Sequence, residues 1–255
     1  MPDDKQYPLT SRFLQGRLRH LMSAADKDQL EQLANRDEVL RGEQVIIERG
    51  QICEHSTMLV DGFILRTIKK RGRTCVVGAH VPGDFVDLHG FALKRLDHTI
   101  LVIGNAHLAY FPHEGLEELM RENPRLSRIL WFASLLDAAI HRTWILKLQQ
   151  CRADERLAHL FAELWCRLEM VGLSRHDGFA SPLTQTHLAE MSGISVVHAN
   201  RALRNLRRLD LGQFRRGRLY SQQRAELEKH GKFAPDYLYG EGMLHVQARN
   251  ELSLR

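Results

Sequence analysis

The chain has 255 residues, of which 44% are hydrophobic and 26% charged, with a formal net charge of +5. This balance excludes a wholly disordered chain and supplies enough apolar residues for one large or two modest cores. The four cysteines form no CxxC pair and no metal-ligand spacing, so we expect reduced thiols. The chain begins with polar residues, and no apolar run approaches the ~20 residues of a membrane span. We therefore expect a soluble cytoplasmic protein.

Short apolar or alternating segments separated by glycines occupy residues from about 30 to 111. Alternation and glycine punctuation are the signals of β-strands and turns. So many strands in so short a stretch predict a closed or rolled antiparallel sheet, although an all-β sandwich fits the pattern equally well. The clearest candidate strands are residues 45–47, 57–60, 63–68, 75–77 and 99–103.

From residue 123 to 150 the periodicity becomes helical, with no glycine and, after Pro124, no proline. Apolar and small residues recur at alternating spacings of three and four, which is the heptad pattern. We expect a parallel two-stranded coiled coil between two copies of the chain, with packing against the chain's own core as the alternative. Leu130, Leu135 and Ile145 are expected to face the chain's own sheet. The predicted seam consists of Leu126, Ile129, Ala133, Leu136, Ile140 and Thr143.

A second amphipathic helix is predicted from Asp154 to Val171, followed by a loop and a helix-turn-helix. Thr184 can cap the first helix of this motif, Gly193 can take the left-handed turn conformation, and Ser195 can cap the second helix. One face of the second helix is small and apolar, and the other carries arginines that suit the DNA major groove. A generic pair of basic helices is the alternative. The inward face comprises Ala199, Ala202, Leu203 and Leu206, and the outward face Val197, Asn200, Arg201, Arg204 and Arg208.

Directly after this helix, residues 211–220 form two short extended runs around a glycine-containing turn. This pattern predicts a wing, a β-hairpin whose tip meets the DNA backbone. Arg215, Arg216 and Arg218 lie at the predicted tip, where guanidinium groups would neutralise phosphates without reading sequence. Beyond residue 225 the signals weaken, and residues 239–255 are polar enough to be partly disordered.

The order of rolled sheet, long helix and basic winged helix-turn-helix resembles the Crp/Fnr family of bacterial transcription regulators over nearly the whole chain. The motifs at 41–43, 47–50, 59–62 and 81–85 look like turns of the family's cyclic-nucleotide-binding β-roll, and residues 195–201 are similar to recognition helices in one branch. The resemblance implies an α+β fold with an N-terminal antiparallel β-roll of the jelly-roll type, a long dimerisation helix and a C-terminal winged helix-turn-helix. It divides the chain into a sensor-like domain (1–122), the helix (123–150), a DNA-binding domain (151–238) and a tail (239–255).

The resemblance also implies roles within the helix-turn-helix. Arg201 occupies the place of the family's guanine-reading arginine, whose rigid fork can bond O6 and N7 together. Val196 and Val197 stand where better-known members carry an arginine and a glutamate, so we expect contacts with thymine methyl groups and an unusual operator. A buried helical position is the alternative for His198. The expected DNA-contacting residues are Thr184, Gln185, Thr186, Ser195, Val196, Val197, His198, Asn200, Arg201, Arg204, Arg215, Arg216 and Arg218.

The sensor-like domain lacks the residues by which relatives hold a cyclic nucleotide. The places of the family's Gly-Glu and Arg-Ser or Arg-Thr pairs are taken by Asp87-Leu88 and His98-Thr99, so the carboxylate and guanidinium contacts are missing. We therefore do not expect cyclic AMP as the ligand, and the effector stays unidentified. The chain also lacks the cysteine set that holds an iron–sulfur cluster in oxygen-sensing relatives, so no cofactor is expected.

Metal sensing through His80, His89 and His98 and redox sensing through Cys75 are weaker hypotheses for this domain. The residues predict a dimeric regulator, not an enzyme, that binds palindromic double-stranded DNA, with RNA polymerase as an open further partner. Two other classes stay open: a ligand-binding or protein-interaction module whose helix-turn-helix is only a scaffold, and an enzyme with a histidine or cysteine centre, for which no nucleophile–base arrangement is recognisable.

Overall fold

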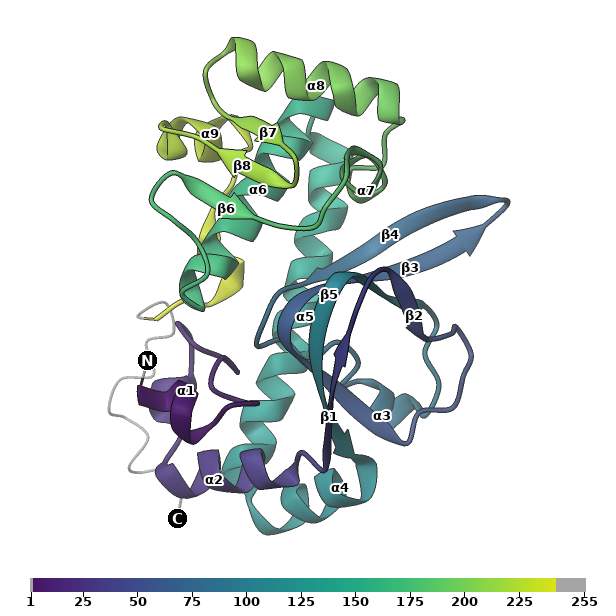
Figure 1. Cartoon of the computed structure of the whole chain (residues 1–255), viewed down its shortest axis with the longest axis vertical. Helices are drawn as coiled ribbons and strands as arrows, with labels where there is room; N and C mark the ends of the chain where they lie inside the picture. Colours follow the sequence, from purple (N-terminus) through teal and green to yellow (C-terminus); the bar gives the residue numbers. More distant parts are fainter. Residues whose placement is uncertain (1, 242–255) are drawn as a thin grey trace.

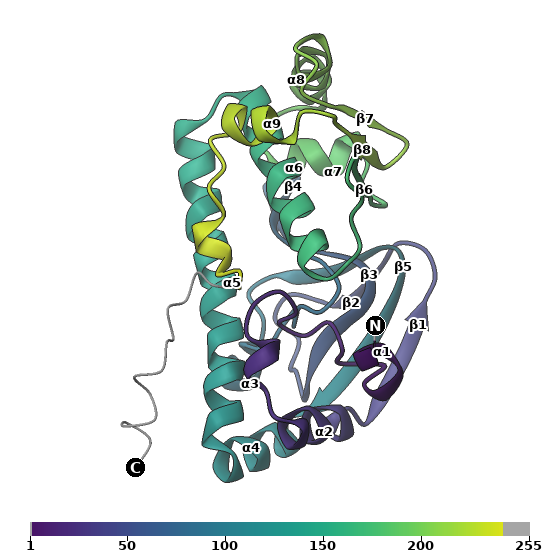
Figure 2. The same ribbon diagram turned by 90° about the vertical axis from the view of Figure 1, so that its left-hand side faces the viewer.

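The computed structural model in Figure 1 describes residues 2–241. A β-roll lies at one end and a small helical unit with a second sheet at the other, and the long helix α5 (Pro124–Gln150) runs past both. Figure 2 shows that both units lie on the same side of α5. The N-terminal segment contains α1 (Pro2–Gln6), the 3-10 turn η1 (Arg19–Leu21) and α2 (Ala24–Leu33). Most of the tail predicted to be disordered, residues 242–255, lies outside the described residues.

The roll is a five-stranded antiparallel sheet in the order β1-β5-β3-β4, with β2 also paired to β5. The predicted antiparallel β-roll is therefore confirmed. Its strands are β1 (Arg36–Leu40), β2 (Gln44–Ile47), β3 (His55–Lys70), β4 (Arg73–His80) and β5 (Thr99–Pro112).

Strand β3 runs continuously through the two segments predicted as separate strands at 57–60 and 63–68. The register against β5 shifts on both sides of Asp61, so the strand bulges there and does not end. Gly62 permits this because its φ is +102° and a Cβ at this position would lie 2.4 Å from the carbonyl oxygen of Asn105. The glycine marks a bend within one strand.

Both faces of the roll's central strands are buried. Leu59, Ile64 and Val102 belong to an apolar cluster formed mainly by strand residues, whereas neighbouring side chains such as Met58 and Leu65 join the main core with the helices. Because successive side chains point to opposite faces of a strand, this division places one cluster on each face of the sheet. The sheet thereby joins two cores.

Three helices follow or interrupt the roll: α3 (Gly90–Leu93), α4 (His113–Glu122) and α5. The side chain of Asn123 caps α5 by accepting from the Leu126 backbone N–H at 3.0 Å, and Pro124 follows in the first turn, where a missing N–H costs nothing.

By length and composition α5 could also cross a membrane. Its charged residues argue for a different setting, because Asp137 pairs with Arg66 of the roll and Lys147 is buried.

Helix α5 buries a different face from the one expected. Leu126, Ile129, Leu136 and Ile140 of the predicted coiled-coil seam pack into the chain's own core, and Ala133 and Thr143 are half-buried. Two residues assigned to the chain's own sheet, Leu135 and Ile145, face solvent instead, whereas Leu130 is buried as expected. The seam residues therefore pack against the chain's own core, the alternative given above, and one neighbouring element is α6 (Ala153–Met170).

The remaining elements form the unit beyond α5. Its helix α6 buries Leu157, Leu160, Phe161, Leu164 and Trp165 at helical spacing and is the centre of the unit's core. A three-stranded sheet in the order β6-β8-β7 packs beside it. The other elements are β6 (Gly178–Ala180), α7 (Gln185–Met191), α8 (Val196–Arg208), β7 (Gln213–Arg215), β8 (Arg218–Tyr220), α9 (Arg224–His230) and η2 (Pro235–Leu238).

Candidate nucleic-acid interface

The helix-turn-helix is built by the capping chemistry that the sequence predicts. The Thr184 hydroxyl accepts from the His187 backbone N–H at 3.2 Å, and the Ser195 hydroxyl accepts from the His198 N–H at 3.3 Å. Gly193 turns the chain between the helices with a φ of +63°, where its missing side chain also leaves room for Leu148. These short-range bonds fix the angle at which α8 leaves α7.

Helix α8 has one buried face and one exposed face. Ala199, Ala202 and Leu206 are buried against the unit's core, and the Asn205 side chain donates to Asp154 of α6 at 2.7 Å. On the opposite side Val197 is 62% exposed, and Arg201 and Arg204 are exposed with no hydrogen bond or ion pair to any residue within 2–241. A hydrated guanidinium without an internal partner is free to bond phosphate or base edges.

His198 lies on the exposed surface of α8, which excludes the alternative of a buried helical histidine. Its Nδ1 lies 2.8 Å from the Ser195 hydroxyl, so these two candidate contacts are hydrogen-bonded to each other. The hydroxyls of Thr184 and Ser195 both accept capping hydrogen bonds from backbone N–H groups, so in the free protein these residues position α7 and α8.

The wing is a tight hairpin between β7 and β8. Its central residues Arg216 and Gly217 have φ values of +50° and +74°, the left-handed pair that a two-residue type I′ turn requires. Gly217 is also held closely, because its carbonyl accepts from the Ser181 backbone N–H at 2.7 Å. Arg215 and Arg216 are exposed, whereas Arg218 is half-buried and donates to the Tyr220 hydroxyl at 3.2 Å.

A hollow of about 320 Å³ lies between α8 and the wing. It brings together Gln185, Asn200, Arg204 and Arg215, four of the residues expected to contact DNA. Two further lining residues, Arg207 and Gln213, were not among the expected contacts. Arg204 and Arg207 are three residues apart, so they lie on adjoining turns of one helix face. This spacing could have predicted Arg207 as a further DNA contact.

Residues 155–230 match the family model of the Crp-like helix-turn-helix domain. The transcriptional activator protein FnrL of Cereibacter sphaeroides is 29% identical over 171 residues, which cover 65% of this chain and 67% of the relative. The transcriptional activator protein FnrA of Stutzerimonas stutzeri is 24% identical over 71% of this chain and 74% of its own. Among solved structures, FixK2 from Bradyrhizobium japonicum has a TM-score of 0.71 at 19% identity and covers 78% of this chain and 98% of FixK2. The chain therefore carries a Crp-like helix-turn-helix domain at residues 155–230 and is similar to Crp/Fnr transcription regulators over about 71% of its length.

The matched domain and these relatives confirm several predictions made from the residues. The fold is the family's combination of a cyclic-nucleotide-binding-like domain and a C-terminal helix-turn-helix. The protein is a DNA-binding transcription regulator and not an enzyme.

Two residues at the places of the family's nucleotide-holding pairs, Asp87 and His98, are used internally. Asp87 is fully buried and accepts from both the backbone N–H and the hydroxyl of Thr57 on β3, and its burial raises its pKa to about 7. His98 is 5% exposed and its Nδ1 lies 2.8 Å from Asp97, while burial lowers its pKa. His98 therefore does not offer the positive charge that a cyclic phosphate needs, and Leu88, in the place of the family's glutamate, has no carboxylate for a ribose.

The histidines and cysteines do not assemble into a metal site among residues 2–241, where no group of three or more His, Cys, Asp or Glu side chains could hold a metal ion. The rings of His89 and His98 lie 5.3 Å apart between centroids, and burial lowers the pKa of His89 to about 4. Burial raises the pKa of Cys53, Cys151 and Cys166, which disfavours the thiolates that an iron–sulfur cluster needs. These residues do not fit such a cluster.

Proposed function

We propose that this regulator binds palindromic duplex DNA as a homodimer, with α8 in the major groove and the wing on the backbone. The observation that carries the proposal is the pair of exposed guanidinium groups at Arg201 and Arg204, which have no partner within residues 2–241. Arg204 shares a hollow with Arg215 of the wing, and Arg216 is exposed beside it. Such a surface meets base edges on the helix and phosphates on the wing.

Within this arrangement Arg201 is the base-reading residue, because its planar fork can bond O6 and N7 of one guanine. Val196 and Val197, which are 40% and 62% exposed, precede it at the start of α8. Their methyl groups can meet thymine methyls but cannot accept or donate hydrogen bonds. The operator half-site should therefore contain a guanine flanked by thymines.

The dimer contact that we propose is the exposed apolar stripe of α5. Trp131, Leu135 and Ile145 are 65%, 49% and 55% exposed, although such side chains are costly to leave in water. With Ala138 and Arg142 they recur at alternating spacings of four and three, the repeat of a two-stranded coiled coil. A two-fold pairing along this stripe would set two copies of α8 on half-sites about one DNA turn, ~34 Å, apart.

Selection of bound fragments from random duplex DNA by the purified full-length chain tests this proposal. We expect an inverted repeat with half-site centres separated by about 10 base pairs. Enrichment of a single half-site would contradict the dimer, and absence of any binding in dilute salt would favour a scaffold role for the helix-turn-helix. Because several relatives are named transcriptional activators, we extend the proposal to RNA polymerase as a partner in the cytoplasm.

A further inference from the structure

Residues 231–241 follow directly on the part of the chain that matches the family model, and they fold back along the molecule. Figure 2 shows this segment, drawn in yellow, running from α9 along α5 to the N-terminal segment. It includes η2, and the Glu241 backbone N–H donates to the Gly16 carbonyl at 2.9 Å. We call residues 231–241 the clasp, because they contact α6, α5 and the N-terminal segment together.

The first contact of the clasp is with α6. The buried His159 donates from Nδ1 to the Gly231 carbonyl at 3.0 Å, and Tyr237 stacks on the His159 ring with 6.3 Å between centroids. The Tyr237 hydroxyl donates to Glu163 Oε2 at 2.7 Å. Because Glu163 is fully buried, this bond satisfies a carboxylate oxygen that water does not reach.

The clasp also contacts α5 and the N-terminal segment. The ring of Tyr239 lies edge-on to Phe132 of α5, with 5.8 Å between centroids. Leu238 is fully buried in the main core, and its carbonyl accepts from Arg17 Nε at 2.8 Å. Arg17 is itself buried, so this is a charge-assisted hydrogen bond away from water.

The N-terminal segment is in turn fixed to the roll. Arg12 Nη1 donates to the Val60 carbonyl of β3 at 3.0 Å, and Phe13 packs edge-on against Phe85 with 5.4 Å between ring centroids. A Cβ on Gly83 would lie 2.2 Å from the Arg12 carbonyl oxygen, so the two backbones touch. The clasp therefore connects the DNA-binding unit to the roll through the N-terminal segment.

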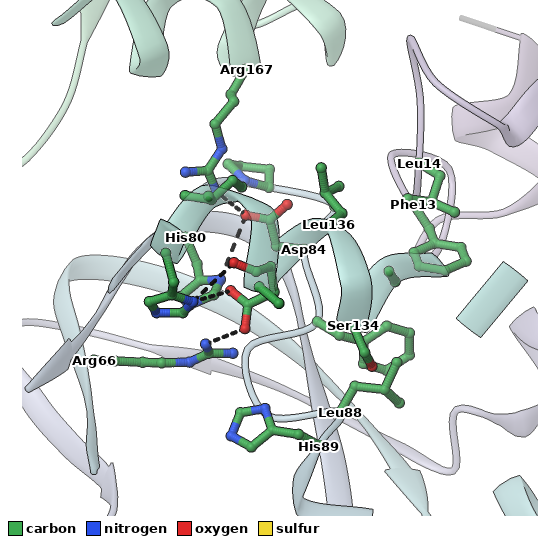
Figure 3. Close-up of a pocket in the computed structure, with 18 of the residues that line it drawn as sticks. Phe13, Leu14, Arg66, His80, Asp84, Leu88, His89, Ser134, Leu136 and Arg167 are labelled. Atoms are coloured by element: carbon green, nitrogen blue, oxygen red, sulfur yellow. Dashed lines mark hydrogen bonds and ion pairs between the residues drawn. The ribbon is translucent and has the colours of Figure 1, made fainter. Parts of the chain in front are cut away.

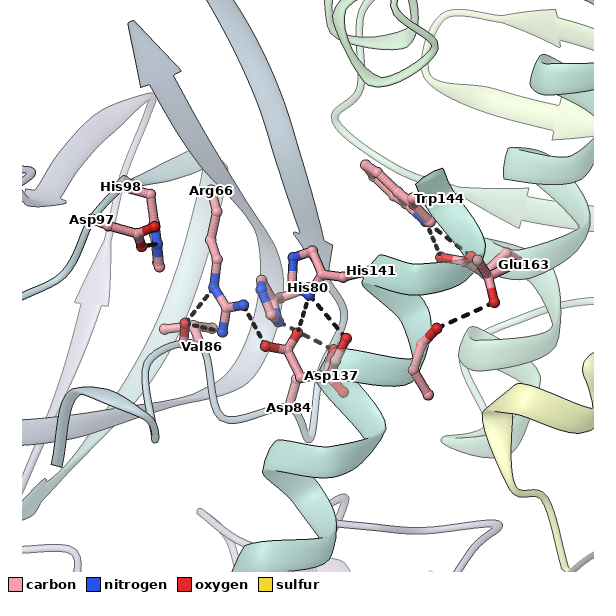
Figure 4. Close-up of polar contacts among 12 residues, drawn as sticks. Arg66, His80, Asp84, Val86, Asp97, His98, Asp137, His141, Trp144 and Glu163 are labelled. Atoms are coloured by element: carbon pink, nitrogen blue, oxygen red, sulfur yellow. Dashed lines mark hydrogen bonds and ion pairs between the residues drawn. The ribbon is translucent and has the colours of Figure 1, made fainter. Parts of the chain in front are cut away.

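The clasp also supports the ion pair between α6 and the roll. Arg167 donates from Nη1 to Glu163 at 3.3 Å and from Nη2 to Asp84 of the roll (Figure 3). Trp144 of α5 donates to both Glu163 oxygens (Figure 4). Tyr237 is a further donor to the same carboxylate, so the clasp helps to hold Glu163 against Arg167.

The backbone joins the two units only where α5 continues into α6. Cys151 and Arg152 separate these helices, and such a short connection can act as a hinge. At the other end of α6, Met170 packs so closely on the N-terminal segment that a Cβ on Gly16 would lie 2.7 Å from the Met170 Cβ. Attachment at this second end removes the freedom of α6 to rotate about the end of α5.

We propose that the clasp is a positioning segment that holds the DNA-binding unit in one orientation on the roll. In the homodimer proposed above, a fixed orientation of α8 in each subunit sets one spacing and one rotation between the two half-sites. A dimer with the clasp in place therefore discriminates against operators whose half-sites are shifted. Only this consequence for DNA rests on the proposed function, because the orientation is a property of the free chain.

Electron-spin distance measurement on the full-length chain without DNA tests the orientation. One label is attached to Cys75, an exposed thiol of the roll, and the other to Arg216→Cys at the wing tip, in a Cys166→Ser background. An excess of unlabelled chain confines the signal to one subunit. Leu238→Asp places a charge in the core and should release the clasp, making the distance distribution about twofold broader. Equal widths with and without this substitution overturn the proposal.

Asp236→Asn is the matched control, because Asp236 is exposed and its side chain forms no hydrogen bond or ion pair within residues 2–241. It should keep the narrow distribution. If Leu238→Asp does not fold, Tyr237→Phe combined with Leu238→Ala takes its place, because this pair removes one hydrogen bond and part of the apolar contact without burying a charge. An unchanged width in the double variant would equally refute the clasp.

DNA with altered half-site spacing tests the consequence. Two added base pairs rotate one half-site by about 70°, so wild type should bind such a duplex far more weakly than the selected operator. Leu238→Asp should reduce this discrimination about tenfold and leave the affinity for a single half-site unchanged. Unchanged discrimination despite a broadened distance distribution would overturn the effect on operator choice. A wild-type chain that binds no duplex would contradict the proposed function, whereas the distance measurement still decides the clasp.

Discussion

Two regions of this regulator are rich in arginine, but the arginines are exposed in one region and buried in the other. On α8 and the wing, Arg201, Arg204 and Arg216 are exposed and form no ion pair within residues 2–241. Where the roll meets α5, Arg66 is buried and bonded to Asp137 (Figure 4), and where it meets α6, Arg167 is buried and bonded to Asp84 (Figure 3). The exposed arginines are available to a polyanion, and their loss should affect binding. The buried ones hold the chain's parts together, and their loss should affect stability.

The largest effect should come from breaking the buried pair between the roll and α6. Arg167→Met leaves Asp84 and Glu163 without their guanidinium, and such uncompensated buried charges cost about 3–5 kcal/mol of unfolding free energy. Chemical denaturation of the full chain measures this loss. Arg224→Met is the matched control, because its partners Glu169 and Glu228 are partly exposed and it should cost at most about 1 kcal/mol. Similar losses in both variants would remove the distinction between buried and exposed arginines.

The dimer contact can be tested with two neighbouring residues of α5. Leu135→Asp places a charge on the exposed stripe and should weaken dimerisation by about 3 kcal/mol or more without unfolding the chain. Leu136→Asp places the same charge in the core, where Leu136 is 5% exposed, and should unfold it. Sedimentation velocity separates the two results. A folded dimer of the Leu135→Asp variant would mean that the subunits meet elsewhere.

This contrast on α5 also marks the boundary of what the sequence could predict. The caps at Thr184 and Ser195 and the turn at Gly193 depend on bonds between residues three or four apart, so their chemistry is readable locally. Helix α5 carries two stripes of heptad spacing, and only the tertiary partners decide which one is buried.

The contacts that join the N-terminal segment, the roll and α6 could not be predicted from the sequence for the same reason. Asp84 and Arg167 are separated by 83 positions, and Arg17 meets Leu238 across 221. No local pattern indicates such pairs, because each residue alone looks like an ordinary surface charge. The roll was predictable as a class from its glycines, but the continuity of β3 through Gly62 depended on its pairing with β5.

Lowering the pH should test the buried network through His80, which is 3% exposed and lies 3.6 Å from Asp84. Burial lowers the pKa of His80 from 6.5 to about 4 in the folded chain, so the unfolded chain takes up a proton first as the pH falls. The stability contributed by the neutral ring is complete above pH 6.5 and is lost toward pH 4, by about 3 kcal/mol. Denaturation at both pH values should show a smaller loss in His80→Asn; an equal loss would place the proton uptake elsewhere.

The smallest and most specific effects belong to the exposed arginines. Arg201→Ala should cost about 1–3 kcal/mol on the selected operator and much less on random DNA, because it removes a base contact. Arg216→Ala, at the wing tip, should weaken binding to both duplexes alike and reduce the slope of log affinity against log salt by about 1, because it removes a phosphate contact. Fluorescence anisotropy at several salt concentrations measures both. Equal losses on operator and random DNA for Arg201→Ala would assign that residue to the backbone and leave base reading to the valines and Asn200.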